Sequence, residues 1–228
     1  MRVRNFERQS PSRDAKSIFI FCEGVNREYD YFHFFTEVDS RVNVEIYPLQ
    51  SDEDNSPLGL FEIAEKSLVF SEGNPQPKYS LEKDDEVWIV LDTDTFKNPH
   101  RHGELETLYE KCKYYKWNVA ESNPCFEVWL YYHFNKEKPS FSNDESSKAW
   151  KSFLNDSIRG GFNPNKHPIH IADAVQNAEA IYSCIGQRPE KCCTSAFLLG
   201  KTINSLLRER LIKIRAFLGI INQKFDKS

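Results

Sequence analysis

The most constraining feature of the sequence is a short apolar run that ends in two carboxylates. Residues 86–91 begin with a charged residue and continue through apolar side chains, and Asp92 and Asp94 follow. A short apolar run bounded by charge predicts a buried strand. Functional groups of α/β domains collect just beyond the carboxyl ends of parallel strands, and residues two apart in a strand point to the same face. We therefore expect these two carboxylates to project together.

Two interpretations of this acidic pair are open. Carboxylates held side by side repel each other unless a cation lies between them, and sites made of oxygen ligands suit Mg²⁺ or Mn²⁺. Alternatively, Asp92 and Asp94 are solvated loop residues at the end of a strand. The pattern by itself does not decide between the two.

The chain is long enough for one large domain, or for a domain with a helical extension. It has 228 residues, of which 39% are hydrophobic and 28% are charged, which predicts a packed core. No apolar run in the sequence approaches the roughly 18 residues that a membrane-spanning helix needs. The first residues lack the apolar stretch of a secretory signal, so we expect a cytoplasmic protein without membrane association.

The six cysteines have no CxxC spacing. This pattern is typical neither of a zinc site nor of the disulfide framework of a secreted protein. We expect reduced, structural thiols.

Charge is unevenly distributed along the chain. The net charge is −4, yet residues 186–228 carry nine Lys or Arg against three Asp or Glu, and residues 1–16 are also basic. Basic flanks around an acidic centre suit a phosphate-rich partner such as nucleic acid. Ordinary cationic helix surfaces would give the same count.

The chain alternates between predicted strands and predicted helices. Apolar and β-branched runs predict strands at residues 17–22, 42–49, 86–91 and 117–120. Helical spacing of apolar residues predicts helices at residues 28–38, 58–70 and 104–116. This alternation predicts an α/β fold with a parallel-rich sheet flanked by helices. Glu23 follows the first strand and would share an edge with the acidic pair, although the sequence does not make the two strands neighbours.

The remaining segments predict an arm and an extension. Residues 1–16 are expected to be a flexible basic arm, and residues 136–228 a helical extension packed on the domain of residues 17–135. Further helices are predicted at residues 149–158, 171–184 and 195–221.

Asn123 and Pro124 precede a segment that is aromatic and apolar nearly all round, which predicts a buried helix. Asn is a good N-cap and Pro a good first helical residue, and capping alone would explain Asn123. Glu127 lies one position too late for a capping box. The helix dipole still favours an acid in the first turn, which is the simplest account of Glu127.

Three segments together resemble the RloB-like family. They are Glu23-Gly24 with Glu28 and Tyr31-Phe32, then Asp92-Thr93-Asp94, then Ser122 to Phe134. The third is the most specific, because it is similar to the family's Ser-Asn-Pro-x-Phe-Glu-x-Trp-Leu signature over nearly its full length. The resemblance spans about residues 17–210, with a weaker match at Thr194. The sequence departs from the family at Asn26-Arg27, where a Lys/Thr-type pair is more usual.

The resemblance implies a divergent Toprim fold, in which one Glu follows the first strand and Asp-x-Asp follows the third. It implies that Glu23, Asp92 and Asp94 bind Mg²⁺ or Mn²⁺ and that these three acids, with Glu127, are catalytic residues of phosphodiester chemistry. Residues 17–135 would then be a Toprim-like catalytic domain. The family also implies a nucleic acid substrate and an ATPase partner protein in bacterial defence against phage.

The individual roles stay open at this point. Glu23 would complete the metal shell or act as general acid or base, and Glu127 would complete the shell or support it from outside. Arg27, Lys97 and Arg101 are the nearest cations in sequence and could offset charge on phosphate, although exposed loop cations are common.

The histidines also allow two interpretations. His100 and His102 follow the acidic pair and are either ligands or proton carriers, or solvated loop residues. His33 and His133 lie within aromatic helices and are expected in the core or partly buried.

Two functions from different classes follow. The first is a metal-dependent nuclease acting in anti-phage defence on DNA or on RNA, with tRNA among the RNA substrates considered. The second is a non-catalytic partner or sensor subunit of an ATPase-containing complex, whose acids bind a metal only to stabilise the fold. The joint presence of Glu23, Asp92, Asp94 and Glu127 favours the nuclease.

Overall fold

A computed structural model describes residues 15–93, 99–139 and 147–219 of the chain. The elements in order are β1 (Lys16–Cys22), α1 (Arg27–His33), β2 (Val42–Ile46), α2 (Pro57–Leu68), β3 (Glu86–Asp92), α3 (Pro99–Tyr115), β4 (Asn118–Ser122), α4 (Glu127–Tyr131), α5 (Ser147–Ser157), η2 (His167–His170), α6 (Ile171–Ile181), β5 (Cys184–Ile185), β6 (Arg188–Pro189) and α7 (Ala196–Phe217).

The first four strands form one parallel sheet in the order β2-β1-β3-β4. The predicted α/β class is therefore confirmed, and the sheet is consistent with a Toprim-like fold. β1 and β3 are direct neighbours, with Cys22 opposite Val90. This adjacency, which could not be predicted from the sequence, brings the carboxyl ends of β1 and β3 together.

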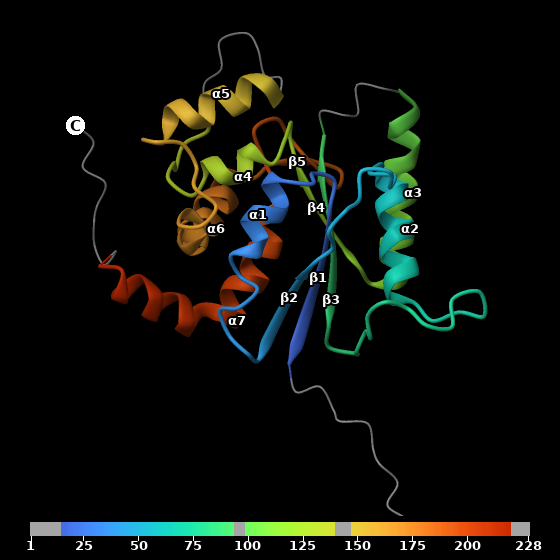
Figure 1. Ribbon diagram of the computed structural model, residues 1–228. Coiled ribbons are helices and arrows are strands. Elements are labelled where there is room, and N and C mark those ends of the chain that lie inside the picture. Colours follow the sequence, from blue (N-terminus) through green and yellow to red (C-terminus); the bar gives the residue numbers. More distant parts are fainter. Residues whose placement is uncertain (1–14, 94–98, 140–146, 220–228) are drawn as a thin grey trace, which may run out of the picture.

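Both faces of the sheet are covered, which explains why β1 and β3 are apolar without alternation. Ile18 and Ile20 of β1 join the core beneath α1, α4 and α7, whereas Phe19 and Phe21 join the core beneath α2 and α3. Figure 1 shows α2 and α3 on one side of the sheet and the other long helices on the opposite side. Side chains of α5, α6 and α7 belong to the first of these cores, so the C-terminal helices share it with the sheet.

The outer edge of β4 is covered by the segment that leads into α7. Ser122 and Thr194 form an antiparallel bridge. The backbone N–H of Asn123 donates to the Cys193 carbonyl at 3.0 Å, and that of Ser195 donates to the Glu121 carbonyl at 2.8 Å. Such pairing satisfies an edge that would otherwise present free backbone groups.

A buried acid ties α7 to the start of β2. The side chain of Asp39 is 1% exposed and lies 3.0 Å from Arg41 Nη2 and 3.1 Å from Arg210 Nε. Hydrogen bonds from Arg41, together with that from Arg210, hold the pKa of Asp39 well below its usual range.

The C-terminal basic excess is partly neutralised within the molecule. Four of its nine cations form ion pairs with the chain's own acids: Arg188 with Glu121, Lys201 with Glu179, Arg210 with Asp39 and Arg215 with Asp173. Four of the cations that suggested a nucleic acid partner are thus paired within the molecule.

Several predicted boundaries differ from the structure. The first helix ends at His33 and gives way to turns, and α3 begins at Pro99, five residues earlier than predicted. The β5–β6 hairpin and η2 were not predicted, because two-residue strands and a single helical turn have no periodicity to detect. Across the described ranges, no helix combines the length and apolar character needed to span a bilayer.

His133 is a neutral histidine inside the core, as its aromatic surroundings predict. It is 2% exposed. Its Nδ1–H donates to the Trp129 carbonyl at 3.1 Å, so its Nε2 accepts from the Tyr31 hydroxyl at 3.0 Å. Burial lowers the pKa of His133 to about 3. His33, by contrast, is exposed and stacks on Tyr29, so its expected burial was wrong.

We predict that His133 makes the fold acid-sensitive. Unfolded His133 takes up a proton below a pKa of about 6.5, whereas folded His133 stays neutral until about pH 3. The unfolded state therefore gains protons first, and stability falls as pH drops through this window. Between pH 6.5 and 4.5 the loss should be about 2–3 kcal/mol. Urea unfolding at both pH values, with His133→Gln as the non-titrating control, measures it; equal pH slopes for the two proteins would contradict the assignment.

Candidate functional site

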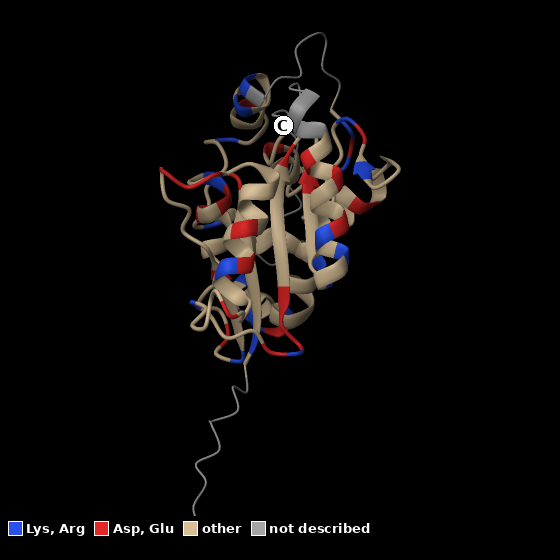
Figure 2. Cartoon of the chain, turned by 90° about the vertical axis from the view of Figure 1, so that its right-hand side faces the viewer, with Lys and Arg blue, Asp and Glu red and all other residues tan. Residues whose placement is uncertain are grey.

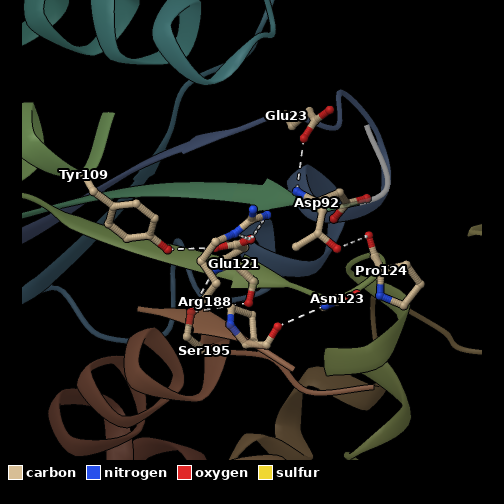
Figure 3. A network of polar contacts seen from close by, with 10 residues as sticks. Glu23, Asp92, Tyr109, Glu121, Asn123, Pro124, Arg188 and Ser195 are labelled. Atoms are coloured by element: carbon tan, nitrogen blue, oxygen red, sulfur yellow. Dashed lines mark hydrogen bonds and ion pairs between the residues drawn. The ribbon is translucent and has the colours of Figure 1, made fainter. Parts of the chain in front are cut away.

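Glu23 and Asp92 lie side by side at the carboxyl edge of the sheet. Glu23 directly follows β1, and its backbone N–H continues the strand pairing by donating to the Val90 carbonyl at 3.0 Å. Its Oε2 accepts a hydrogen bond from the backbone N–H of Asp92 at 3.1 Å (Figure 3). Both side chains are half-buried. The two acids singled out from strand ends in the sequence are thus neighbours in space.

The turn after Asp92 is held against the Ser-Asn-Pro segment. The Thr93 N–H lies 3.0 Å from both the Ser122 and the Pro124 carbonyl oxygens. Ser122 Oγ in turn lies 2.8 Å from Thr194 Oγ1. The end of β3 is therefore fixed by the most family-like stretch of the sequence. Asp94 falls outside the described residues, as does Lys97.

Asn123 does not cap a helix, so that prediction was wrong. The Asn123–Pro124 peptide is cis, and α4 begins only at Glu127. The Asn123 side chain donates through Nδ2 to the Pro189 carbonyl at 3.0 Å (Figure 3). Asn123 instead joins the Ser-Asn-Pro turn to the β5–β6 hairpin, 66 residues away in sequence.

Glu127 is the first residue of α4 and is almost completely buried. Its side chain is 3% exposed, and its Oε1 lies 2.9 Å from Arg27 Nη1 at the start of α1. The side chain of Arg27 is 39% exposed. The dipole of α4, five residues long, is therefore not the main partner of this acid, because a full positive charge lies next to it.

Glu28 is a buried acid of the same region that sequence reasoning did not select. Its carboxylate lies so close to Gly24 that a Cβ at that position would be 2.0 Å from Glu28 Oε2. Burial, and to a lesser extent the charges of Glu127 and Glu23, raise the pKa of Glu28 to about 7. The signal in the sequence was the pairing of Gly24 with an acid in the first turn of the next helix.

The pKa values of two buried thiols are affected by the same group of acids. Burial raises the pKa of Cys22, and the charges of Glu28 and Asp92 raise it further. Burial likewise raises the pKa of Cys125, with added contributions from Glu127 and Asp92. Both cysteines are therefore neutral thiols and not nucleophiles. The described cysteines form no disulfide.

Another buried acid, Glu121, stabilises the site from the opposite face of the sheet. Glu121 is fully buried in β4. Its Oε1 lies 3.1 Å from Arg188 Nε and 2.9 Å from Arg188 Nη2, and its Oε2 accepts from the Tyr109 hydroxyl at 2.7 Å (Figure 3). Its backbone N–H donates to Ser195 Oγ at 2.8 Å. This network joins α3, β4 and β6 behind the strand ends. Nothing in the sequence signalled it, because Glu121 lies just past the predicted fourth strand.

The carboxylate oxygens at the carboxyl ends of β1 and β3 suit a hard divalent cation. Carboxylate oxygens are the ligands that Mg²⁺ and Mn²⁺ prefer, and the charges of Glu127 and Glu23 add to the effect of burial on the pKa of Glu28. Within the described ranges, no three His, Cys, Asp or Glu side chains are arranged to hold a metal ion. A complete site would therefore need a further ligand, for which Asp94 is the sequence candidate.

Three further predicted site residues lie at the start of α3. The backbones of His100, Arg101 and His102 form the start of α3, but their side chains fall outside the described part. Their proposed contacts with metal or phosphate stay predictions.

We predict that Glu28→Gln stabilises the metal-free protein more as pH rises. The folded-state pKa of about 7 exceeds the unfolded value of 4.5, so ionisation of Glu28 destabilises the fold progressively between these values and fully above them. The stability of the Gln variant relative to wild type should rise by up to about 3 kcal/mol between pH 4.5 and 8. Melting curves in a chelator across this range test the sign; a difference that is constant with pH would contradict it.

Comparison with known proteins gave one match. The family model described as RloB-like protein matches residues 18–203, which is most of the chain. No curated protein matches the chain, and no solved structure does.

Proposed function

The chain belongs to the RloB-like family, and from this premise we propose that it is a metal-dependent nuclease that hydrolyses phosphodiester bonds in DNA or RNA. The observation that carries the proposal is the adjacency of Glu23 and Asp92 at the carboxyl ends of neighbouring parallel strands. This edge is where α/β domains place their functional groups.

Asp92 and Asp94, with Glu23, are the residues proposed to hold Mg²⁺ or Mn²⁺. When bound, such an ion neutralises a phosphate oxygen and lowers the pKa of a bound water. The hydrogen bond from the Asp92 N–H holds Oε2 of Glu23 at the end of β3.

Glu28 is the acid of this region best suited to move protons near neutral pH. A general acid or base works best when its pKa lies near the operating pH, and the pKa of Glu28 is raised to about 7. Its carboxylate lies close to Gly24, the residue that follows Glu23 in the chain. We assign Glu28 the role of proton carrier, and Glu23 the role of ligand, as the first arrangement to test.

The proposal of a nucleic acid substrate rests on the acidic residues of the candidate site more than on the charge of the protein surface. Acidic and basic residues are interspersed on the side covered by α2 and α3 (Figure 2). Four cations of the C-terminal part are paired with the chain's own acids. A substrate of either kind, DNA or structured RNA such as tRNA, would then be gripped mainly near the site and by the remaining cations.

A biological setting follows from the family resemblance. An RloB-like nuclease is expected to act beside an ATPase partner in bacterial anti-phage defence. The second candidate is a non-catalytic partner or sensor subunit of the ATPase-containing complex, whose acids bind a metal only to stabilise the fold.

We predict that Mg²⁺ or Mn²⁺ raises the melting temperature and that Asp92→Asn removes the rise. A cation at a hundredfold its Kd stabilises the fold by about 2.7 kcal/mol, which corresponds to about 5–10 °C for a chain of this size. Differential scanning calorimetry with and without each metal measures the shift. The matched control is Asp84→Asn, which alters an exposed acid before the opposite end of β3.

The same proteins are then incubated with plasmid, single-stranded DNA and total tRNA. Metal-dependent cleavage that Asp92→Asn abolishes and Asp84→Asn retains is expected. A clear metal shift without cleavage of any substrate would favour the non-catalytic subunit. A melting curve that neither metal changes would contradict the metal site.

A further inference from the structure

Arg27 is a fixed cation at the edge of the acidic region. It is the first residue of α1, and its Nη1 lies 2.9 Å from Glu127 Oε1. Nη1 is buried, and it lacks a hydrogen bond of good geometry among the described residues. The contact between Nη1 and Glu127 is therefore an ion pair, and the side chain of Arg27 is 39% exposed.

The environment of Glu127 makes this cation necessary. A carboxylate with 3% exposure loses most of its hydration, and such a charge persists in a fold only when it is paired. The charge of Glu127 contributes to the raised pKa of Glu28, so a second carboxyl group lies within electrostatic range of Glu127. Arg27 is the cation that the structure supplies to this acid.

We propose that Arg27 takes the place of a second metal ion, so that the site binds one divalent cation and Glu127 is a positioning residue for Arg27 instead of a ligand. This inference rests on the proposed function. In two-metal sites the ions lie about 3.5–4 Å apart and share carboxylates. A guanidinium in contact with Glu127 occupies that carboxylate and repels a second dication.

The identity of the cation has a chemical consequence. A guanidinium is a planar fork that can bind a phosphate through two parallel hydrogen bonds, whereas an ammonium cannot. Arg27, whose side chain is 39% exposed, can therefore stabilise a phosphate while Glu127 holds it from behind. Lysine at this position would keep the charge and lose the bidentate geometry.

Metal stoichiometry tests the inference directly. Isothermal titration of the wild-type protein with MnCl₂, without nucleic acid, should give one Mn²⁺ per chain. Two ions per wild-type chain would overturn the inference and leave the proposed function standing. No binding at all would overturn both, so the two failures are distinguishable.

Variants then assign the effect to Arg27. Arg27→Gln frees Glu127 while filling the space, and its stoichiometry should rise to two. The double variant Arg27→Gln/Glu127→Gln removes both charges and should return to one. Arg27→Lys keeps the charge and should also bind one. A stoichiometry that stays at one in Arg27→Gln would show that Arg27 does not exclude a second ion.

The test still gives an answer if the Arg27→Gln variant is unstable. If Arg27→Gln does not fold, the wild-type stoichiometry still decides the number of ions. The double variant then shows whether the buried carboxylate alone caused the failure, because only the neutral pair should restore a cooperative melting curve. A double variant that also fails to fold would assign the pair a purely structural role and overturn the proposal.

Discussion

Parallel pairing of β1 with β3 is the constraint on which the candidate site depends. Both strands are apolar on both faces and are buried between two layers of helices, and their register sets Cys22 opposite Val90. The residues that leave the two strands, Glu23 and Asp92, must then meet. Their hydrogen bond at 3.1 Å is a consequence of backbone register, and no local feature around either acid would have produced it alone.

Acids that lie close together at the carboxyl ends of the strands repel one another. Nearby arginines offset part of this repulsion. Arg27 lies on Glu127, and Arg188 lies on Glu121 behind the edge. Burial raises the pKa of Glu28 to about 7, and the charges of Glu127 and Glu23 add to this shift. The buried acids of this region thus fall into two groups: Glu121 and Glu127 each contact an arginine, and Glu28 has a pKa near neutrality.

The sequence predicted this fold where local rules and burial agree. Continuous apolar runs gave β1 and β3, and their alternation with helices gave a parallel sheet. Strand order, and with it the meeting of Glu23 and Asp92, depends on packing across 69 residues of sequence and was not available. The capping role of Asn123 was wrong because Pro189, distant in sequence, provides its side-chain partner. The burial of Glu28 and the Arg27–Glu127 contact are likewise properties of packed elements and not of any motif.

The most direct test of the central claim is anomalous diffraction from crystals soaked with Mn²⁺. We expect an anomalous peak at the carboxyl ends of β1 and β3, within about 2.3 Å of a carboxylate oxygen of Asp92 and next to Glu23. The same peak should be lost in Asp92→Asn crystals. A Mn²⁺ peak elsewhere on the molecule, or a fully occupied site that does not involve Asp92, would contradict it.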